Sequence, residues 1–186
     1  GWHNAKEDLP SLRLANLAAL QHPLSVDTYI EQTLCHAKAV LVRLIGGMPY
    51  WAYGLQQLRA VAEENGIALA VLAADGRADS QLDEISTLPV STLLRLRQLC
   101  DAGGPDAASA ALAQLALSAG LFARPKIGQK IPPRVGGWSL QNRLSCPAAF
   151  ALRVAPKPAV VISFYLSYLT AADLAPIEAA TEALEA

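Results

Sequence analysis

Histidine, cysteine and acidic side chains build most metal sites and many active sites, and here they are scattered along the chain. The histidines and cysteines are His3, His22, His36, Cys35, Cys100 and Cys146. They show no C-x-x-C pair and no spacing typical of a zinc site. The chain also lacks a G-x-S-x-G nucleophile motif and a G-x-x-x-x-G-K-[ST] phosphate-binding loop. The sequence therefore predicts no catalytic residue, no bound metal and no phosphate site in this chain.

The most unusual stretch is RLIGGMPYWAYG, which runs from Arg43 to Gly54. An apolar run stops there at two glycines, and a proline and three large aromatic residues follow. Open α/β sheets bind ligands at the carboxyl ends of their strands, where glycine lets the backbone turn through positive φ and lets a neighbour approach closely. The candidate contacts to a substrate or a neighbouring domain are Arg43, Gly46, Gly47, Tyr50, Trp51, Tyr53 and Gly54.

A helix that begins near Pro49 would divide these aromatic residues between two stripes. One stripe holds Trp51, Leu55, Leu58 and Ala62, and the adjacent stripe holds Tyr50, Tyr53 and Gln57. In one interpretation Trp51 anchors the core while the tyrosines cover a domain contact; in the other, the three aromatics form a pocket for a flat ligand or a partner domain. Gly54 costs about 1 kcal/mol against alanine inside a helix, so we expect another element to pack closely against it.

Apolar, β-branched runs alternate with helical segments along the chain. The predicted strands are Ser11 to Leu17, Ala39 to Ile45, Ile67 to Ala73 and Ala159 to Leu166, of which Val40 to Leu44, Ala68 to Leu72 and Val160 to Phe164 are expected to be buried. The predicted helices are Ser25 to Ala37, Pro49 to Asn65, Val90 to Asp101, Asp106 to Ala119 and Pro176 to Ala186. This alternation predicts an α/β fold, a parallel sheet with helices on both faces. Arg43, a lone charge in its strand, should reach the end of the sheet or pair with an acid.

The pattern divides the chain into three parts. Residues 1–123 form an α/β head, residues 124–157 an irregular, basic, proline-rich connection, and residues 158–186 the start of a second α/β unit. No acidic residue occurs between Ala107 and Ala172, so the connection is either a solvated loop or a basic face that meets an acidic partner or domain. Because a strand and helix without a returning strand make half a crossover, we expect a piece of a longer protein.

Composition restricts the class of protein further. A hydrophobic content of 53% with 17% charged residues predicts a folded chain, and a net charge of −1 gives no reason to expect a nucleic acid or a membrane surface as partner. The Ala-rich stretch from Ala107 to Phe122 is too short and too mild to span a bilayer. An odd number of separated cysteines and no signal sequence predict a cytoplasmic protein.

Several blocks of the sequence occur in the order and spacing of a known family. They are HPLSVDTYIEQTL, VRLIGGMPYWAYGLQQLR, DEIST, GGPDAASAAL and FYLSYLTAADLAPIEAATEALEA. Together they resemble the N-terminal region of the large subunit of aerobic cobaltochelatase, the CobN type, from about Pro10 to the end and least over 124–157. The RL-GG-x-x-YW-x-YG block is the most specific, and Tyr165 in the last block is a further candidate contact. Leu166 replaces the arginine of the family's F-Y-R motif, and Ala107 replaces an asparagine that follows its glycine pair.

The resemblance implies a function for the whole family. Its members act as ATP-dependent ligases that insert Co²⁺ into hydrogenobyrinic acid a,c-diamide, a corrinoid tetrapyrrole, in aerobic cobalamin biosynthesis. The large subunit holds tetrapyrrole and metal, and two motor subunits of the CobS and CobT type hydrolyse ATP. This segment would then be structural or binding, with no cofactor of its own, while Co²⁺ and ATP-Mg serve the whole complex. The alternatives are the magnesium-chelatase H subunit of chlorophyll synthesis, which the YW-x-YG block disfavours, and a non-catalytic α/β module that binds a ligand or partner.

Overall fold

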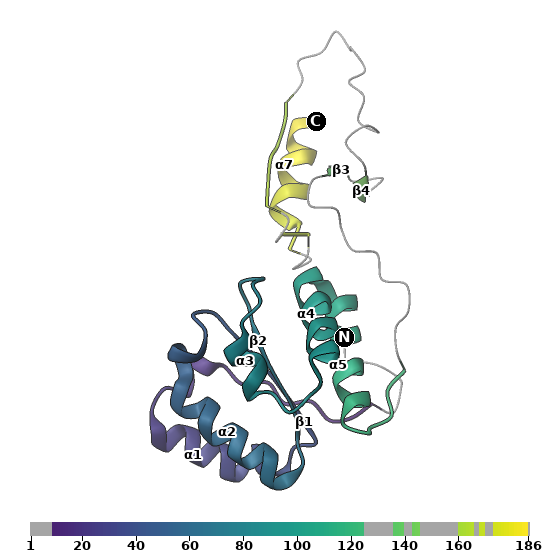
Figure 1. The fold of residues 1–186 in the computed structure, drawn as a ribbon. Helices are drawn as coiled ribbons and strands as arrows, with labels where there is room; N and C mark the ends of the chain where they lie inside the picture. Colours follow the sequence, from purple (N-terminus) through teal and green to yellow (C-terminus); the bar gives the residue numbers. More distant parts are fainter. Residues whose placement is uncertain are drawn as a thin grey trace.

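A parallel pair of strands, β1 (Ala39–Leu44) and β2 (Ala68–Ala73), forms the centre of the fold in the computed structural model of this chain. Ala39 lies opposite Ala68 and Leu44 opposite Ala73. Helices cover both faces of this small sheet (Figure 1). The structure describes residues 9–124, 136–139, 143–145, 160–165, 168–169 and 173–185. The predicted α/β class, with a parallel sheet between helices, is confirmed.

The helices follow the strands in the expected alternation. They are α1 (Pro23–Gln32), α2 (Ala52–Asn65), α3 (Ser80–Ile85), α4 (Val90–Ala102), α5 (Gly104–Ser118) and α7 (Ala175–Glu185), with short 3₁₀ turns at Leu17–Ala19, Leu34–His36 and Met48–Trp51. Gly66 ends α2 in the left-handed conformation at φ 65°, which glycine adopts at no steric cost. Within the described part of the chain, no helix has the length and apolar character needed to cross a bilayer.

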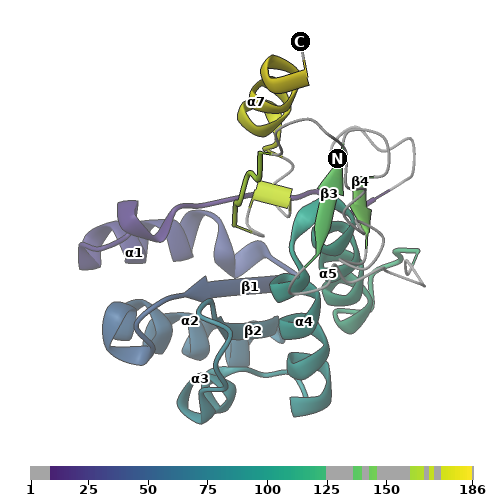
Figure 2. The same ribbon diagram turned by 90° about the horizontal axis from the view of Figure 1, so that it is seen from above.

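Two apolar cores lie on opposite faces of the sheet, because successive side chains of a strand point to opposite sides. Leu69, Val71 and Ala73 of β2 pack with α1, α2 and α3 in the first core. Ala70 and Leu72 pack with α4 and α5 in the second core. The view from above shows the two strands between these helical layers (Figure 2).

The two strands differ in how completely they are buried. All six residues of β2 are buried, whereas in β1 Ala39, Val40 and Leu41 are half-buried. The sequence prediction that Val40 to Leu44 are buried is therefore wrong for Val40 and Leu41, which are half-buried, and for Arg43, which is exposed and pairs with an acid. The reason is that β1 has β2 on one side and, in the described part of the chain, no strand on the other.

The N-terminal prediction needs three corrections. The first helix begins at Pro23 rather than Ser25, because His22 Nδ1 accepts a hydrogen bond from the Leu24 N–H at 3.2 Å and caps the helix. It ends at Gln32, and a separate 3₁₀ turn follows. The predicted strand from Ser11 to Leu17 is absent, and the Leu17–Ala19 turn begins where it would end. Helix α3 was not predicted.

The C-terminal prediction is confirmed for the helix and wrong for the strand. Helix α7 forms, but Val160 to Phe164 is not a strand: Val160 is 65% exposed and Val161 88% exposed. A β-branched run becomes a strand only where another strand pairs with it, and among the described residues none does. Phe164 instead meets the ring of Trp138 edge-on at 6.1 Å.

The connection at 124–157 falls mostly outside the described residues. Its described part is not wholly irregular, because β3 (Gly137–Ser139) and β4 (Arg143–Ser145) pair as short antiparallel strands. The boundaries of the three predicted parts stay predictions.

Candidate functional site

The two glycines of the unusual stretch lie at the carboxyl end of β1, where the chain turns toward α2. Gly46 has φ 96° and Gly47 has φ 67°, a region that residues with a side chain rarely adopt. A Cβ atom on Gly47 would lie 3.1 Å from Asp79 Oδ2, and one on Gly46 would lie 3.4 Å from Tyr50 Cβ. The segment of Ile45, Gly46 and Gly47, called the glycine turn below, therefore needs glycine both for its backbone angles and for its close neighbours.

Asp79 connects the glycine turn with the loop that follows β2. Its Oδ1 accepts hydrogen bonds from the N–H groups of Gln81 at 3.0 Å and Leu82 at 3.4 Å, which caps α3. Its other oxygen faces Gly47. Local sequence patterns could not predict this contact, since 32 positions separate the two residues along the chain.

Trp51 is part of the core. It is 6% exposed, and its indole Nε1 donates a hydrogen bond of 2.7 Å to the carbonyl of Leu20. The indole covers Gly54, where an added Cβ would lie 2.1 Å from the Trp51 Cε2 atom. The predicted burial of Trp51 is confirmed. Gly54 is closely packed as expected, but its partner is the Trp51 ring at the start of the same helix and not another element.

The two tyrosines point elsewhere. Tyr50 is 47% and Tyr53 39% exposed, and the Tyr53 hydroxyl donates a hydrogen bond of 2.8 Å to Asp27 Oδ1. This hydrogen bond, with desolvation and the negative charge of Asp27, raises the pKa of Tyr53. The three aromatics thus do not converge on one pocket: Trp51 packs inside, while the tyrosines cover the surface of α2 and its preceding turn.

Arg43 pairs with an acid, as its isolation in an apolar strand predicted. Its Nη2 lies 3.0 Å from Asp101 Oδ1 at the end of α4, and both side chains are 35% exposed. Cys100 lies in the same region, where burial raises the pKa of its thiol and Arg43 partly opposes that shift. A thiol with a raised pKa stays protonated at neutral pH and is a poor nucleophile.

Tyr165 is 80% exposed, and among the described residues no hydrogen bond or ring contact joins its side chain to the glycine turn. Leu166 lies outside the described residues. Ala107, the other departure from the family pattern, is buried in α5.

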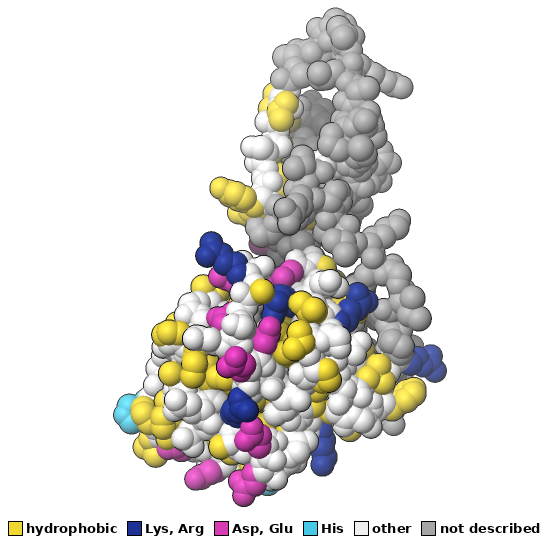
Figure 3. Space-filling model, viewed as in Figure 1, with side chains coloured by type: hydrophobic (Ala, Val, Ile, Leu, Met, Phe, Trp, Pro, Cys, Tyr) yellow, Lys and Arg dark blue, Asp and Glu magenta, His cyan; other side chains and the backbone are white. Residues whose placement is uncertain are grey.

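The surroundings of the glycine turn suit contact more than catalysis. Ile45 is 66% exposed, so it and Tyr50 present apolar surface beside exposed backbone. In the described part of the chain, no group of three or more His, Cys, Asp or Glu side chains could hold a metal ion. Acidic, basic and apolar side chains are interspersed on the face that Figure 3 shows.

Comparison with known proteins finds relatives over nearly the whole chain. The chain is 32% identical over 197 aligned residues to the aerobic cobaltochelatase subunit CobN of a Sinorhizobium species, an alignment that covers 99% of this chain and 15% of the relative. It is 34% identical over 193 residues to the subunit of the same name from Pseudomonas aeruginosa, with 97% of this chain and 14% of the relative covered. The chain thus spans about one seventh of the length of these relatives.

Two further comparisons complete these findings. No family model matches the chain. Among solved structures, the catalytic subunit of cobaltochelatase from Mycobacterium tuberculosis resembles it with a TM-score of 0.42 and 23% identity, over 57% of this chain and 9% of that one. On the strength of the sequence relatives, the chain belongs to the family of aerobic cobaltochelatase subunits of the CobN type, of which it corresponds to one short segment.

Proposed function

We propose that this chain is a non-catalytic segment of the large subunit of an ATP-dependent cobaltochelatase. The whole enzyme would insert Co²⁺ into hydrogenobyrinic acid a,c-diamide in aerobic cobalamin biosynthesis, together with two motor subunits of the CobS and CobT type that use ATP-Mg. The observation that carries this proposal is the identity of 32–34% to subunits named CobN over 97–99% of the chain.

The role proposed for the segment is to pack against the body of the subunit through the glycine turn. Ile45 and Tyr50 expose apolar surface there, and Gly46 and Gly47 expose backbone that a neighbour can approach closely. The groups that hold the metal and the macrocycle would then come from other parts of the large subunit.

A chimera tests the proposal with the function as the readout. The corresponding segment of the Pseudomonas aeruginosa subunit is replaced by this chain, and cobalt insertion is followed by absorbance in the presence of the motor subunits and ATP. We expect the chimera to insert cobalt and this chain alone, under the same conditions, to insert none. The matched control carries an unrelated α/β domain of similar length in place of the segment and should be inactive.

Three outcomes would contradict the proposal. Turnover by the isolated chain would place the chemistry within it. A folded chimera without activity would favour a separate ligand- or partner-binding module. A chimera that inserts magnesium into protoporphyrin and ignores cobalt would favour the magnesium-chelatase H subunit.

A further inference from the structure

The side of β1 that faces away from β2, called the outer edge of β1, carries backbone groups that no described residue pairs with. The carbonyls of Lys38 and Leu44 accept hydrogen bonds from the N–H groups of Ala68 and Ala74, at 3.1 and 2.8 Å, so even-numbered residues of β1 face β2. Residues alternate between the two sides in a parallel ladder. The backbone groups of Ala39, Leu41 and Arg43 therefore point outward, and in the described part of the chain no hydrogen bond meets them.

The other edge of the sheet is closed by the chain itself. The N–H groups of Leu69 and Val71 donate to the hydroxyls of Thr87 and Ser86, at 2.8 and 2.9 Å, and the Thr87 N–H donates to the Leu69 carbonyl at 3.0 Å. Among the described residues nothing comparable covers the outer edge of β1, and its AVLVRL sequence contains no proline. An apolar strand edge of this kind is a template for pairing with another chain.

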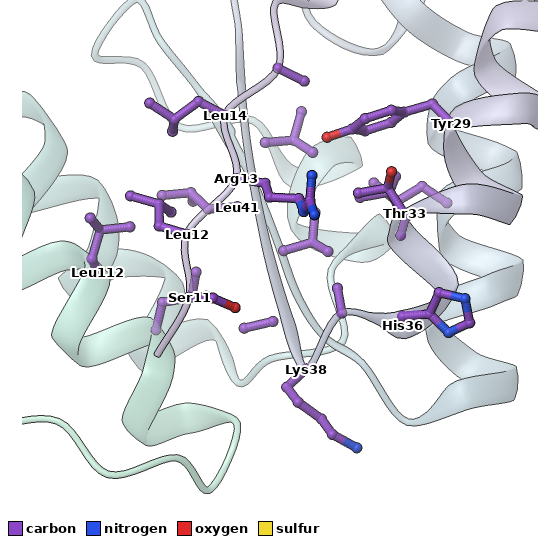
Figure 4. A pocket seen from close by; sticks show the side chains of 18 of the residues that line it. Ser11, Leu12, Arg13, Leu14, Tyr29, Thr33, His36, Lys38, Leu41 and Leu112 are labelled. Atoms are coloured by element: carbon purple, nitrogen blue, oxygen red, sulfur yellow. The ribbon is translucent and has the colours of Figure 1, made fainter. Parts of the chain in front are cut away.

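A cavity of about 850 Å³, called the β1 slot below, runs along this outer edge. Every residue from His36 to Arg43 lines one wall, and Pro10 to Ala15 line the opposite wall. Tyr29 and Thr33 border the slot on the α1 side, and Leu112 borders it on the α5 side (Figure 4). The slot thus has a strand edge as one wall and a helix on each flank.

The charges in the β1 slot have one sign. Arg13, Lys38 and Arg43 line it, with the His36 imidazole beside them, and no aspartate or glutamate is among its lining residues. Arg43 is already paired with Asp101. The Arg13 side chain extends across the slot toward Tyr29 and Thr33, and Lys38 lies at one end (Figure 4). An occupant that carries a carboxylate would match these cations.

We propose that the β1 slot accepts one extended strand of another polypeptide. This strand pairs with the outer edge of β1. Six residues of β1 offer about 20 Å of edge at roughly 3.3 Å per residue, which suits a strand of similar length. Because helices flank both faces, the strand is apolar along its length, as in strands buried on both sides. It carries a carboxylate at an end, next to Arg13 or Lys38. Backbone pairing gives the affinity and the charges fix the position.

A fluorescent peptide, acetyl-EVIVVLE-amide with a dye on a terminal linker, tests this proposal by anisotropy titration with the whole 186-residue chain. The control peptide has the same side chains but N-methyl groups on alternate amides, which removes the donors of one strand edge. We expect the first peptide to bind and to slow hydrogen exchange of Ala39, Leu41 and Arg43. The control is made in two forms, with the N-methyl groups on one or the other set of alternate amides. We expect one of the two forms to bind at least tenfold more weakly than the unmethylated peptide.

Charge-reversal variants distinguish peptide binding at this site from nonspecific binding to the protein surface. Arg13→Glu with Lys38→Glu should weaken peptide binding at least tenfold, while the matched reversal Arg95→Glu, on exposed α4 surface outside the slot, should leave it unchanged. Circular dichroism checks that each variant is folded.

Equal binding of methylated and unmethylated peptides, or no binding at all, would overturn the proposal. Tight binding of dodecanoate with none of the peptide would assign the slot to a small anionic amphiphile, and β1 amides protected in a peptide-free dimer would assign it to a second copy of the chain.

Discussion

At the scale of single residues, Trp51 determines how the unusual stretch folds. Its indole is buried, donates to the Leu20 carbonyl before α1 and covers Gly54 in α2. The close approach explains why a helix interior contains glycine despite a cost of about 1 kcal/mol relative to alanine. A bulky residue and a glycine occur in the same turn because the Trp51 ring occupies the space that a side chain at position 54 would fill.

This packing predicts a coupling between two substitutions. Gly54→Ala should destabilise the chain by about 1–3 kcal/mol, as overpacking does, since the new Cβ would meet the indole. Trp51→Ala should cost about 3–5 kcal/mol. In the double variant the alanine at position 54 should cost nothing further or restore some stability, because the ring is gone and alanine favours the helix. Denaturant melts of the four proteins measure the cycle, and strictly additive costs would contradict the contact.

Tyr53 and Asp27 predict a stability difference that depends on pH. The pKa of Tyr53 is raised above its ordinary value of 10.0, so the folded state favours the protonated phenol. Its contribution is fully present below the unfolded pKa and is lost as pH rises through the folded pKa. The stability of the chain relative to Tyr53→Phe should therefore fall as pH rises through that alkaline range. Ultraviolet titration of the phenol measures the pKa, and Asp27→Asn should lower it; an unchanged pKa would contradict the role of this carboxylate.

At this scale, the sequence predicted properties that depend on local spacing. Helical periodicity placed Trp51 inside, and the lone charge of Arg43 predicted a partner. The identities of the partners were not predictable, since Tyr53 meets Asp27, Trp51 meets Leu20 and Arg43 meets Asp101 across long sequence separations. Hydrogen bonds of this kind depend on how α1, α2 and α4 dock, which no local pattern specifies.

At the scale of elements, the loop after α3 completes the sheet. Thr87 Oγ1 accepts from the Leu69 N–H and donates to the Ile67 carbonyl, at 2.8 and 2.9 Å, and Ser86 bonds Val71. These contacts satisfy backbone groups of a fully buried strand without a third strand. They also fix α3, whose C-terminal end immediately precedes Ser86.

Removing the Thr87 hydroxyl tests this closure. Thr87→Val should destabilise the chain by about 1–3 kcal/mol, because it leaves the Leu69 N–H and the Ile67 carbonyl without partners. Thr87→Ser keeps the hydroxyl and is the matched control, with a much smaller expected effect. Denaturant melts give the free energies, and faster hydrogen exchange at Leu69 in the valine variant locates the change. Equal stability of the valine and serine variants would show that water replaces the hydroxyl.

Composition predicted β1 and β2 well and the C-terminal strand wrongly, for one physical reason. All three runs are apolar or β-branched, but β1 and β2 have each other as hydrogen-bonding partners. Val160 to Phe164 has no strand partner among the described residues and remains exposed. The composition of a segment indicates how well its residues would fit a β-sheet. Whether the segment forms a strand also depends on a second segment that pairs with it, and its own composition does not reveal that partner. Helix α3 was missed because it is only six residues long and its cap, Asp79, also suits a turn.

At the scale of the whole molecule, two features of the head point outward. The glycine turn exposes Ile45 and backbone at the carboxyl end of β1, and the β1 slot exposes the outer edge of the same strand. The glycine turn is the surface proposed to pack against the body of the subunit, and the β1 slot is the surface proposed to accept a strand of another polypeptide. The two proposals are separable, because one concerns the end of β1 and the other concerns its side.

Ile45 and Tyr50 allow the stability of the chain to be separated from its function in the chimera with the Pseudomonas aeruginosa subunit. Ile45→Ser with Tyr50→Ala changes exposed side chains, so the free energy of unfolding of the isolated chain should change by less than about 1 kcal/mol. If the glycine turn packs against the body of the subunit, the same pair should slow cobalt insertion by the chimera at least fivefold, because it removes apolar contact area there. Val90→Ser with Leu94→Ser, which changes exposed residues of α4, is the matched control and should leave the rate unchanged. Normal turnover by the Ile45 and Tyr50 variant would show that this surface is not an interface, while equal losses from both pairs would indicate a general loss of folding in the chimera.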